Sequence, residues 1–310
     1  MEQRQTFSIK GDSRNKVLVE WIAEIIFTIC AFFAVLAVIS ITIYMILNGT
    51  PAIFEVGLKE ILFGTSWQPA AETPSFGILY VILTSIVGTS IAVLVGAPIG
   101  VLTAVFIEEI ASPKLAALVK PAVELLAGIP SVIYGLLGIY LLNPMMYKLE
   151  IMIFADSETH QFTGGANLIS AIIVLAIMIL PTVINVTASA IHTVPRQQRA
   201  ASLAMGASQI QTIFKVVLPS AKSGIVAAVV LGTGRAIGEA MAITLVSGSS
   251  VNMPLPFNSV RFLTTAIVAE MGYASGLHRE VLFTIGLVLF VFIMFINIAL
   301  TRVLKGKEND

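Results

Sequence analysis

The chain has 310 residues, of which 57% are hydrophobic and 12% charged, and its mean hydropathy is +0.94. A water-soluble domain of this size cannot bury so many apolar side chains, so the composition excludes an ordinary soluble protein and indicates a membrane protein. Acidic and basic residues balance, and no basic stretch is interleaved with aromatic residues. We therefore expect contact with membrane lipid and no nucleic-acid partner.

Six segments of the sequence are apolar enough to cross a membrane. A bilayer core about 30 Å thick requires about 20 mostly apolar residues in a spanning helix. Because unpaired backbone groups are costly in lipid, we predict an all-α polytopic membrane protein with a six-helix domain over residues 17–303. The first apolar run is too long for the core of a signal peptide, so we expect it to be retained. The six segments are residues 17–47, 78–107, 115–142, 168–191, 221–247 and 281–303.

Lysine and arginine in the flanking segments predict the orientation, because these residues concentrate on the cytoplasmic side. A cytoplasmic N-terminus leaves only four of the flanking basic residues outside: Lys59, Lys148, Arg261 and Arg279. The sequence therefore predicts cytoplasmic tails at residues 1–16 and 304–310. The predicted outer loops lie near residues 48–77, 143–167 and 248–280.

The largest predicted inner loop, residues 193–220, is rich in helix formers. Gly206 permits a sharp turn, so we expect two short helices hinged at this residue. Beyond the hinge, apolar residues recur at helical spacing and predict one apolar face. They are Ile210, Ile213, Phe214 and Val217. Such a face is typical of a helix that docks into a groove and also of a connector that rests on the membrane surface.

Two charged residues, Arg235 and Glu239, lie within the fifth apolar segment. An arginine at mid-bilayer costs about 2.5–3.5 kcal/mol, so we expect it to face protein or a watery cavity. At a spacing of four, the two side chains lie on the same face of a helix and can form an ion pair. Such a pair could stabilise the packing of neighbouring helices, or it could form part of a binding site for an oxyanion. The arginine fork fits a tetrahedral oxyanion, and the carboxylate can accept a hydrogen bond from the acidic proton of phosphate. Gly234 and Gly238 predict close approach of a neighbouring helix.

The third apolar segment combines helix breakers with small and hydroxyl residues. Gly128 and Pro130 predict a break or kink. Two further glycines predict close helix packing, Gly135 and Gly138. Two hydroxyl side chains are candidates to bind an anion on the pathway, Ser131 and Tyr134.

The loop at residues 193–220 resembles the cytoplasmic loop of permease subunits of binding-protein-dependent ABC importers. The resemblance rests on Ala200-Ala201-Ser202, on Gly206 and on Leu218-Pro219, although the family has glutamate where this chain has Ala200. Further stretches resemble the phosphate-specific permeases of that family, and the resemblance extends over most of the chain from Phe63 to Leu304. These stretches are Glu124 to Gly138, Gly234 to Ala242, Trp67-Gln68-Pro69, Phe76-Gly77-Ile78 and Ala269 to Gly272.

The resemblance implies a type I (MetI-like) permease core in the bacterial inner membrane. It implies three kinds of partner: a second homologous permease subunit, a cytoplasmic ATPase dimer and an extracytoplasmic phosphate-binding protein. In this arrangement the partner ATPase uses the ATP, and no cofactor is bound directly by this chain. The implied pathway residues are Arg235, Glu239, Ser131 and Tyr134. The implied ATPase-coupling residues are Ala200, Ala201, Ser202, Gly206, Ile210, Phe214, Leu218 and Pro219.

Other function classes have less support in the sequence. There is no phosphate-binding loop of the Gly-x-x-x-x-Gly-Lys-Ser/Thr type, so the chain is not expected to bind ATP or to act as an enzyme. His160, His192 and His278 are isolated, without the spacing of metal ligands. A permease for another oxyanion, such as molybdate or sulfate, remains an alternative. A secondary anion transporter that uses Arg235 and Glu239 in its own ion path is the more distant one.

Overall fold

The computed structural model describes residues 14–305. Within them α1 (Arg14–Ala52) is one long helix that contains the first predicted span. The chain divides into two units, one ending at Asn48 and the other beginning at Gly49. The predicted tails, residues 1–16 and 304–310, lie almost entirely outside the described residues.

The described part of the second unit is mainly helical. It departs from the all-helical prediction at a hairpin, in which Trp67 of β1 pairs with Phe76 of β2, and at an isolated bridge between Gly248 and Val260. The first half contains η1 (Ile53–Gly57), α2 (Leu58–Phe63), β1 (Trp67–Gln68), β2 (Ser75–Phe76), α3 (Leu79–Val105), η2 (Phe106–Ile110), α4 (Pro113–Gly128), α5 (Ser131–Leu137), η3 (Gly138–Leu142) and α6 (Asn143–Phe154). The second half contains α7 (Leu168–His192), α8 (Arg196–Ala204), α9 (Gln209–Thr212), η4 (Ile213–Val217), α10 (Leu218–Ser220), α11 (Lys222–Gly238), α12 (Met241–Val246), α13 (Leu263–Glu270) and α14 (Gly276–Lys305).

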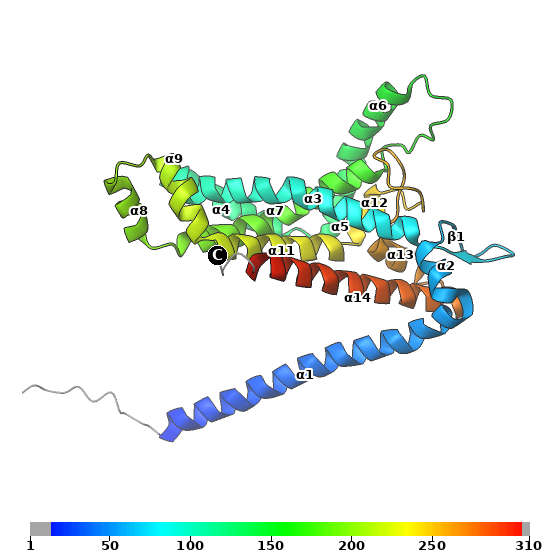
Figure 1. The fold of residues 1–310 in the computed structure, drawn as a ribbon, viewed down its shortest axis with the longest axis horizontal. Helices are drawn as coiled ribbons and strands as arrows, with labels where there is room; N and C mark the ends of the chain where they lie inside the picture. Colours follow the sequence, from blue (N-terminus) through cyan, green and yellow to red (C-terminus); the bar gives the residue numbers. More distant parts are fainter. Residues whose placement is uncertain (1–13, 306–310) are drawn as a thin grey trace, which may run out of the picture. The chain divides into compact units, whose positions relative to one another are not determined.

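The connecting segments of this unit gather at two opposite ends, as Figure 1 shows. Helices α8 and α9 lie at one end of α3, α7 and α11, and the hairpin and α13 lie at the other. The main apolar core lies between these long helices and includes residues such as Ala92, Val174, Ile179, Ala236 and Ile243. The predicted inner loop is therefore at the opposite end from segments that the sequence places outside.

The third apolar segment is displaced from its predicted position. Ile129 is extended (φ −70°, ψ 126°) before Pro130, because proline disfavours a helical conformation in the residue before it. This confirms the predicted break. The sequence prediction of a span at residues 115–142 is wrong in its bounds, since the apolar helical run of spanning length is Ser131–Phe154. Residues 143–154, predicted as loop, form α6.

The fifth apolar segment is also interrupted. Helix α11 ends at Gly238, Glu239 is extended (φ −73°, ψ 130°), and α12 begins at Met241. In the described part of the chain five helices are long and apolar enough to span a bilayer. The number becomes six if Gln209–Ser220 and Lys222–Gly238, bent by 71°, are counted as one span. The exact number of spans stays a prediction.

Two of the predicted packing glycines have the expected surroundings. A Cβ atom at Gly135 would lie 2.6 Å from the Leu245 side chain and 3.0 Å from the Ala242 Cα, and one at Gly138 would collide with Val246. Helix α5 and the start of η3 therefore pack closely on α12 only because these residues lack a Cβ, which confirms the packing prediction. Gly234 and Gly238 have no atom within 4 Å of such a position. No described part of this chain fills the groove predicted there.

Candidate functional site

Arg235 and Glu239 do not form the ion pair that the sequence predicted. Arg235 Nη1 donates a hydrogen bond to Thr182 Oγ1 of α7 at 3.2 Å. Glu239 Oε1 accepts one from the Ala242 backbone N–H at 3.0 Å. The pairing prediction is wrong because a spacing of four brings side chains together only within a continuous helix, and α11 ends between these two residues. Arg235 is therefore held by a neutral hydroxyl.

The backbone break at Glu239 is fixed from both sides. Its carbonyl oxygen accepts a hydrogen bond of 2.7 Å from Thr264 Oγ1 of α13, and its carboxylate binds the first turn of α12. A break inside an apolar segment leaves backbone groups without helical partners. These two hydrogen bonds provide partners for two of those backbone groups, and they hold the chain in its extended conformation beside Arg235.

The Tyr134 hydroxyl has a structural partner. The buried Tyr134 Oη donates a hydrogen bond of 2.7 Å to the Leu126 carbonyl oxygen, in the last turn of α4. Ser131, the first residue of α5, is half-buried. The Tyr134 hydroxyl therefore bridges the break between α4 and α5.

One side of α11 is uncovered over most of its length. Leu231 is 55% exposed, Gly234 and Gly238 are exposed, and Met241 at the start of α12 is 53% exposed. The first three recur at spacings of three and four, so they share one helix face. A helix of this hydropathy leaves such a face open only where lipid or another protein covers it.

The segment at residues 193–220, called here the coupling segment, has the predicted hinge. Helix α8 ends in a Schellman motif, in which Gly206 N–H donates to Leu203 O and Ala207 N–H to Ser202 O. Gly206 has φ +85°, a left-handed conformation that suits glycine. Ser208 then begins α9 with a capping box to Gln211. The prediction of two short helices hinged at Gly206 is confirmed.

The predicted apolar face of the coupling segment is divided between two surroundings. Ile213 and Val217 are buried against residues of α3, α4 and α7. Ile210 and Phe214 are 67% and 54% exposed. The four residues therefore do not form one uncovered apolar face: Ile213 and Val217 pack inside the chain, and only Ile210 and Phe214 stay exposed.

The remaining residues that the sequence predicted to couple to an ATPase differ in their solvent exposure. Ala200, Ala201 and Pro219 are exposed. Ser202 is half-buried, and its hydroxyl lies 2.9 Å from Thr212 Oγ1. Leu218 is half-buried against the apolar cluster that also contains Ile213. The exposed apolar residues of the coupling segment are Leu203, Met205, Ile210 and Phe214.

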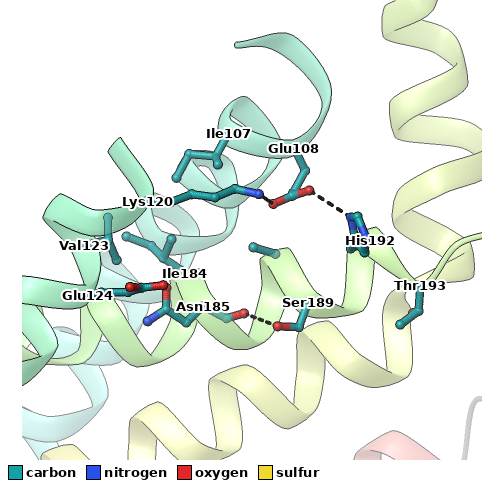
Figure 2. A pocket seen from close by; sticks show the side chains of 11 residues that line it. Ile107, Glu108, Lys120, Val123, Glu124, Ile184, Asn185, Ser189, His192 and Thr193 are labelled. Atoms are coloured by element: carbon teal, nitrogen blue, oxygen red, sulfur yellow. Dashed lines mark hydrogen bonds and ion pairs between the residues drawn. The ribbon is translucent and has the colours of Figure 1, made fainter. Parts of the chain in front are cut away.

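A cavity of about 550 Å³ lies beside the coupling segment, between η2, α4 and α7 (Figure 2). Glu108 forms an ion pair with Lys120 Nζ at 2.6 Å, and His192 Nδ1 lies 3.5 Å from the same carboxylate. Sequence reasoning missed this site because it counted Lys120 only as a flanking charge and His192 only as an isolated residue. Two consecutive glutamates at the end of an apolar segment, Glu108 and Glu109, were the available signal.

Two histidines at the opposite end bind buried carboxylates. His278 Nε2 lies 2.7 Å from Glu270 Oε2, and Arg261 pairs with the other oxygen of the same carboxylate. His160 Nε2 lies 2.9 Å from Glu150 Oε1. The sequence treated these histidines as isolated, because their partners lie eight or more residues away and only the fold brings them together.

Comparison with known proteins agrees with this architecture. The family described as "Binding-protein-dependent transport system inner membrane component" matches residues 96–307. A probable ABC transporter permease, YqgH of Bacillus subtilis, is 36% identical over 96% of this chain and 94% of its own length. The phosphate transport system permease PstC of Haemophilus influenzae is 31% identical over 94% of this chain and 95% of its own.

Solved structures share the fold. A bacterial ABC transporter involved in import of the polysaccharide alginate superposes with a TM-score of 0.59, covering 93% of this chain and 98% of that one at 16% identity. The MetNI methionine ABC transporter, in an inward-facing conformation, gives 0.52 over 74% of this chain and 94% of that one at 24% identity. With its family match and several apolar helices, the chain is a multi-pass membrane protein that belongs to the family of binding-protein-dependent transport system inner membrane components.

Proposed function

We propose that this chain is the permease subunit of an ATP-driven phosphate importer in the bacterial inner membrane and forms half of the translocation pathway. Relatives named as phosphate permeases support the substrate; that of Haemophilus influenzae is 31% identical. The observation that carries the proposal is Arg235. It lies in an apolar helix and binds the neutral Thr182, so its positive charge is left for an anion.

The remaining pathway residues would act around this charge. The second carboxylate oxygen of Glu239 would accept a hydrogen bond from the protonated oxygen of phosphate, a donor that sulfate lacks at neutral pH. Ser131 would offer a hydroxyl to the anion. Tyr134, whose hydroxyl bonds to the Leu126 carbonyl, would position the α4–α5 break beside Arg235.

The topology in this proposal has both termini and the coupling segment in the cytoplasm and the hairpin and α13 outside. The distribution of lysine and arginine supports it. So does the location of the coupling segment at the opposite end of the helices from the hairpin (Figure 1). The outer end would receive a phosphate-binding protein, and the inner end would bind an ATPase dimer that supplies the ATP.

Two exposed surfaces suit the protein partners. The uncovered face of α11, with open space at Gly234 and Gly238, would lie against the pathway and the second permease subunit. The exposed Ile210 and Phe214 of the coupling segment would enter a groove in the ATPase. Ala200 stands where the family has glutamate, so docking in this chain would depend on apolar contacts at that helix end.

The test is ATP-dependent uptake of labelled phosphate by proteoliposomes that contain the assembled transporter. Arg235→Gln should lower uptake at least about tenfold, since loss of a charged partner in a desolvated site costs about 2–5 kcal/mol. Arg302→Gln, an exposed arginine near the end of α14 and outside the coupling segment, is the matched control and should transport normally. Full uptake by Arg235→Gln in an intact complex would contradict the proposal. Uptake of molybdate or sulfate in place of phosphate would indicate another oxyanion, and uptake without the ATPase would indicate a secondary transporter.

A further inference from the structure

The π-helical turn η2 (Phe106–Ile110) ends α3 and directs two consecutive carboxylates toward different partners. Glu109 binds the coupling segment, whereas Glu108 binds α4 and the end of α7. Both side chains are largely buried, with 12% and 10% exposure. Helical turns of this kind are rare and occur frequently at functional sites.

Glu109 is held by both helices of the coupling segment. Arg199 of α8 donates to its Oε1 from Nη2 at 2.8 Å and from Nε at 3.1 Å. Arg199 also donates to two backbone carbonyl oxygens at the end of α7. Gln209 of α9 donates from Nε2 to the Glu109 backbone oxygen at 2.9 Å. The two contacts come from opposite sides of the Gly206 hinge, so a displacement of either helix acts on the same residue.

The coupling segment is tied internally as well. Ser202 of α8 and Thr212 of α9 share a hydrogen bond of 2.9 Å across the hinge. Ser220 Oγ donates to Gln198 Oε1 at 3.0 Å and so joins the start of α8 to α10. These cross-links favour movement of α8, α9 and α10 together, in place of separate movement of each helix.

Glu108 connects η2 to α4. Figure 2 shows its carboxylate between Lys120 of α4 and His192 of α7, at the wall of the cavity. Lys120 Nζ is the closer partner, at 2.6 Å. Helix α4 then runs to Leu126, whose carbonyl oxygen accepts a hydrogen bond from the Tyr134 hydroxyl of α5. Helix α5 packs at Gly135 against Ala242 of α12, whose backbone N–H donates to Glu239. The coupling segment is therefore connected to the break at Glu239 through contacts between η2, α4, α5 and α12.

We propose that Glu108 and Glu109, together called the η2 relay, are positioning residues that transmit movement of the coupling segment to α4 and thereby open and close the pathway at Arg235. The inference rests on the proposed function, because the movement would come from the bound ATPase. Apolar packing also joins these elements, since Val105, Ile107 and Val123 contact Ile213 or its neighbours. The ion pairs join specific atoms, so they restrict how far the elements can slide along one another. Apolar contacts alone do not impose this restriction.

The experiment measures phosphate uptake and ATP hydrolysis in the same proteoliposomes, with all subunits present. Glu109→Gln preserves the size of the side chain and removes its charge. It should lower the ratio of phosphate transported to ATP hydrolysed at least about fivefold, while the ATPase still co-purifies. A purely structural role would lower assembly or thermal stability and leave this ratio unchanged.

A charge exchange tests the second half of the relay. Glu108→Lys and Lys120→Glu should each lower the ratio, because each places like charges together, and the double variant E108K/K120E should restore at least half of the wild-type ratio. Lys114→Gln, which removes an exposed positive charge from the same helix, should keep the wild-type ratio.

Two results would overturn the relay and leave the proposed function standing. They are a wild-type ratio in Glu109→Gln, and a double variant no better than its single parents. A wild-type transporter that takes up no phosphate in the presence of ATP would overturn the proposed function itself. The two failures are therefore distinguishable in one set of measurements.

Discussion

The Glu270 carboxylate at the end of α13 receives donors from three other parts of the chain. Trp67 Nε1 of the hairpin lies 3.1 Å and 3.2 Å from its two oxygens, His278 of α14 lies 2.7 Å away, and Arg261 pairs with it from the preceding loop. The Glu270 side chain is 6% exposed. A buried charge with several charged or polar donors is costly to disturb, because its removal leaves those donors unpaired.

Glu270→Gln should therefore destabilise the protein by about 3 kcal/mol, chiefly by leaving Arg261 buried without its counter-charge. We expect the midpoint of thermal unfolding in detergent to fall by about 6 °C or more. Glu158→Gln removes an exposed carboxylate at the same end and should leave the midpoint unchanged. Equal midpoints for the two variants would show that the cluster contributes no net stability.

At the scale of single elements, the contact of α5 and the start of η3 with α12 depends on the absence of a side chain. A Cβ at Gly138 would collide with Val246, a branched side chain with little freedom to move away. Overpacking of this kind typically costs about 1–3 kcal/mol. Gly234 in α11 has open space at the equivalent position.

Gly138→Ala should accordingly lower the stability of the purified chain by about 1–3 kcal/mol, whereas Gly234→Ala should be neutral or slightly stabilising, since alanine favours helix. Chemical or thermal unfolding in detergent measures both. A larger loss in Gly234→Ala than in Gly138→Ala would contradict the packing described for α5 and α12.

Most of the helices could be predicted from the sequence. The positions at which helices are interrupted could be predicted only in part. Long apolar runs, Pro130 and Gly206 act through local chemistry, and they predicted the helices, the α4–α5 break and the hinge. The end of α11 at Gly238 and the π-helical turns depend on tertiary contacts such as the bond from Thr264 to Glu239. For that reason the Arg235–Glu239 pair was predicted on a helix that the fold does not continue.

At the scale of the whole molecule, the two ends of the second unit differ in what they expose. The coupling segment presents Ile210 and Phe214 to the surroundings on a segment cross-linked by hydrogen bonds. Large exposed apolar side chains on a rigid, polar-rimmed segment are typical of a protein-docking surface. The opposite end also exposes apolar residues, such as Met253 and Leu255, but these lie in an irregular loop. Its two histidine–carboxylate pairs are largely buried.

Ile210→Asp should therefore reduce the amount of ATPase subunit that co-purifies with the chain at least about tenfold, which corresponds to about 1.4 kcal/mol of binding free energy. Leu255→Asp, the same kind of change at an exposed residue of the opposite end, should leave co-purification intact. The amount of membrane-inserted chain, measured in parallel, shows whether either variant fails to fold. Undiminished ATPase in the Ile210→Asp complex would place the docking surface elsewhere.

The end of α11 at Gly238 also bears on biosynthesis. At 1.5 Å per residue its 17 residues measure about 26 Å, less than the hydrocarbon thickness of a bilayer of about 30 Å. The segment also contains Arg235, whose entry into lipid is unfavourable unless Thr182 of α7 is already there. During synthesis, residues 222–246 should consequently insert into the membrane poorly by themselves and efficiently only after α7 has inserted. The helices should therefore assemble in the order in which they occur in the sequence.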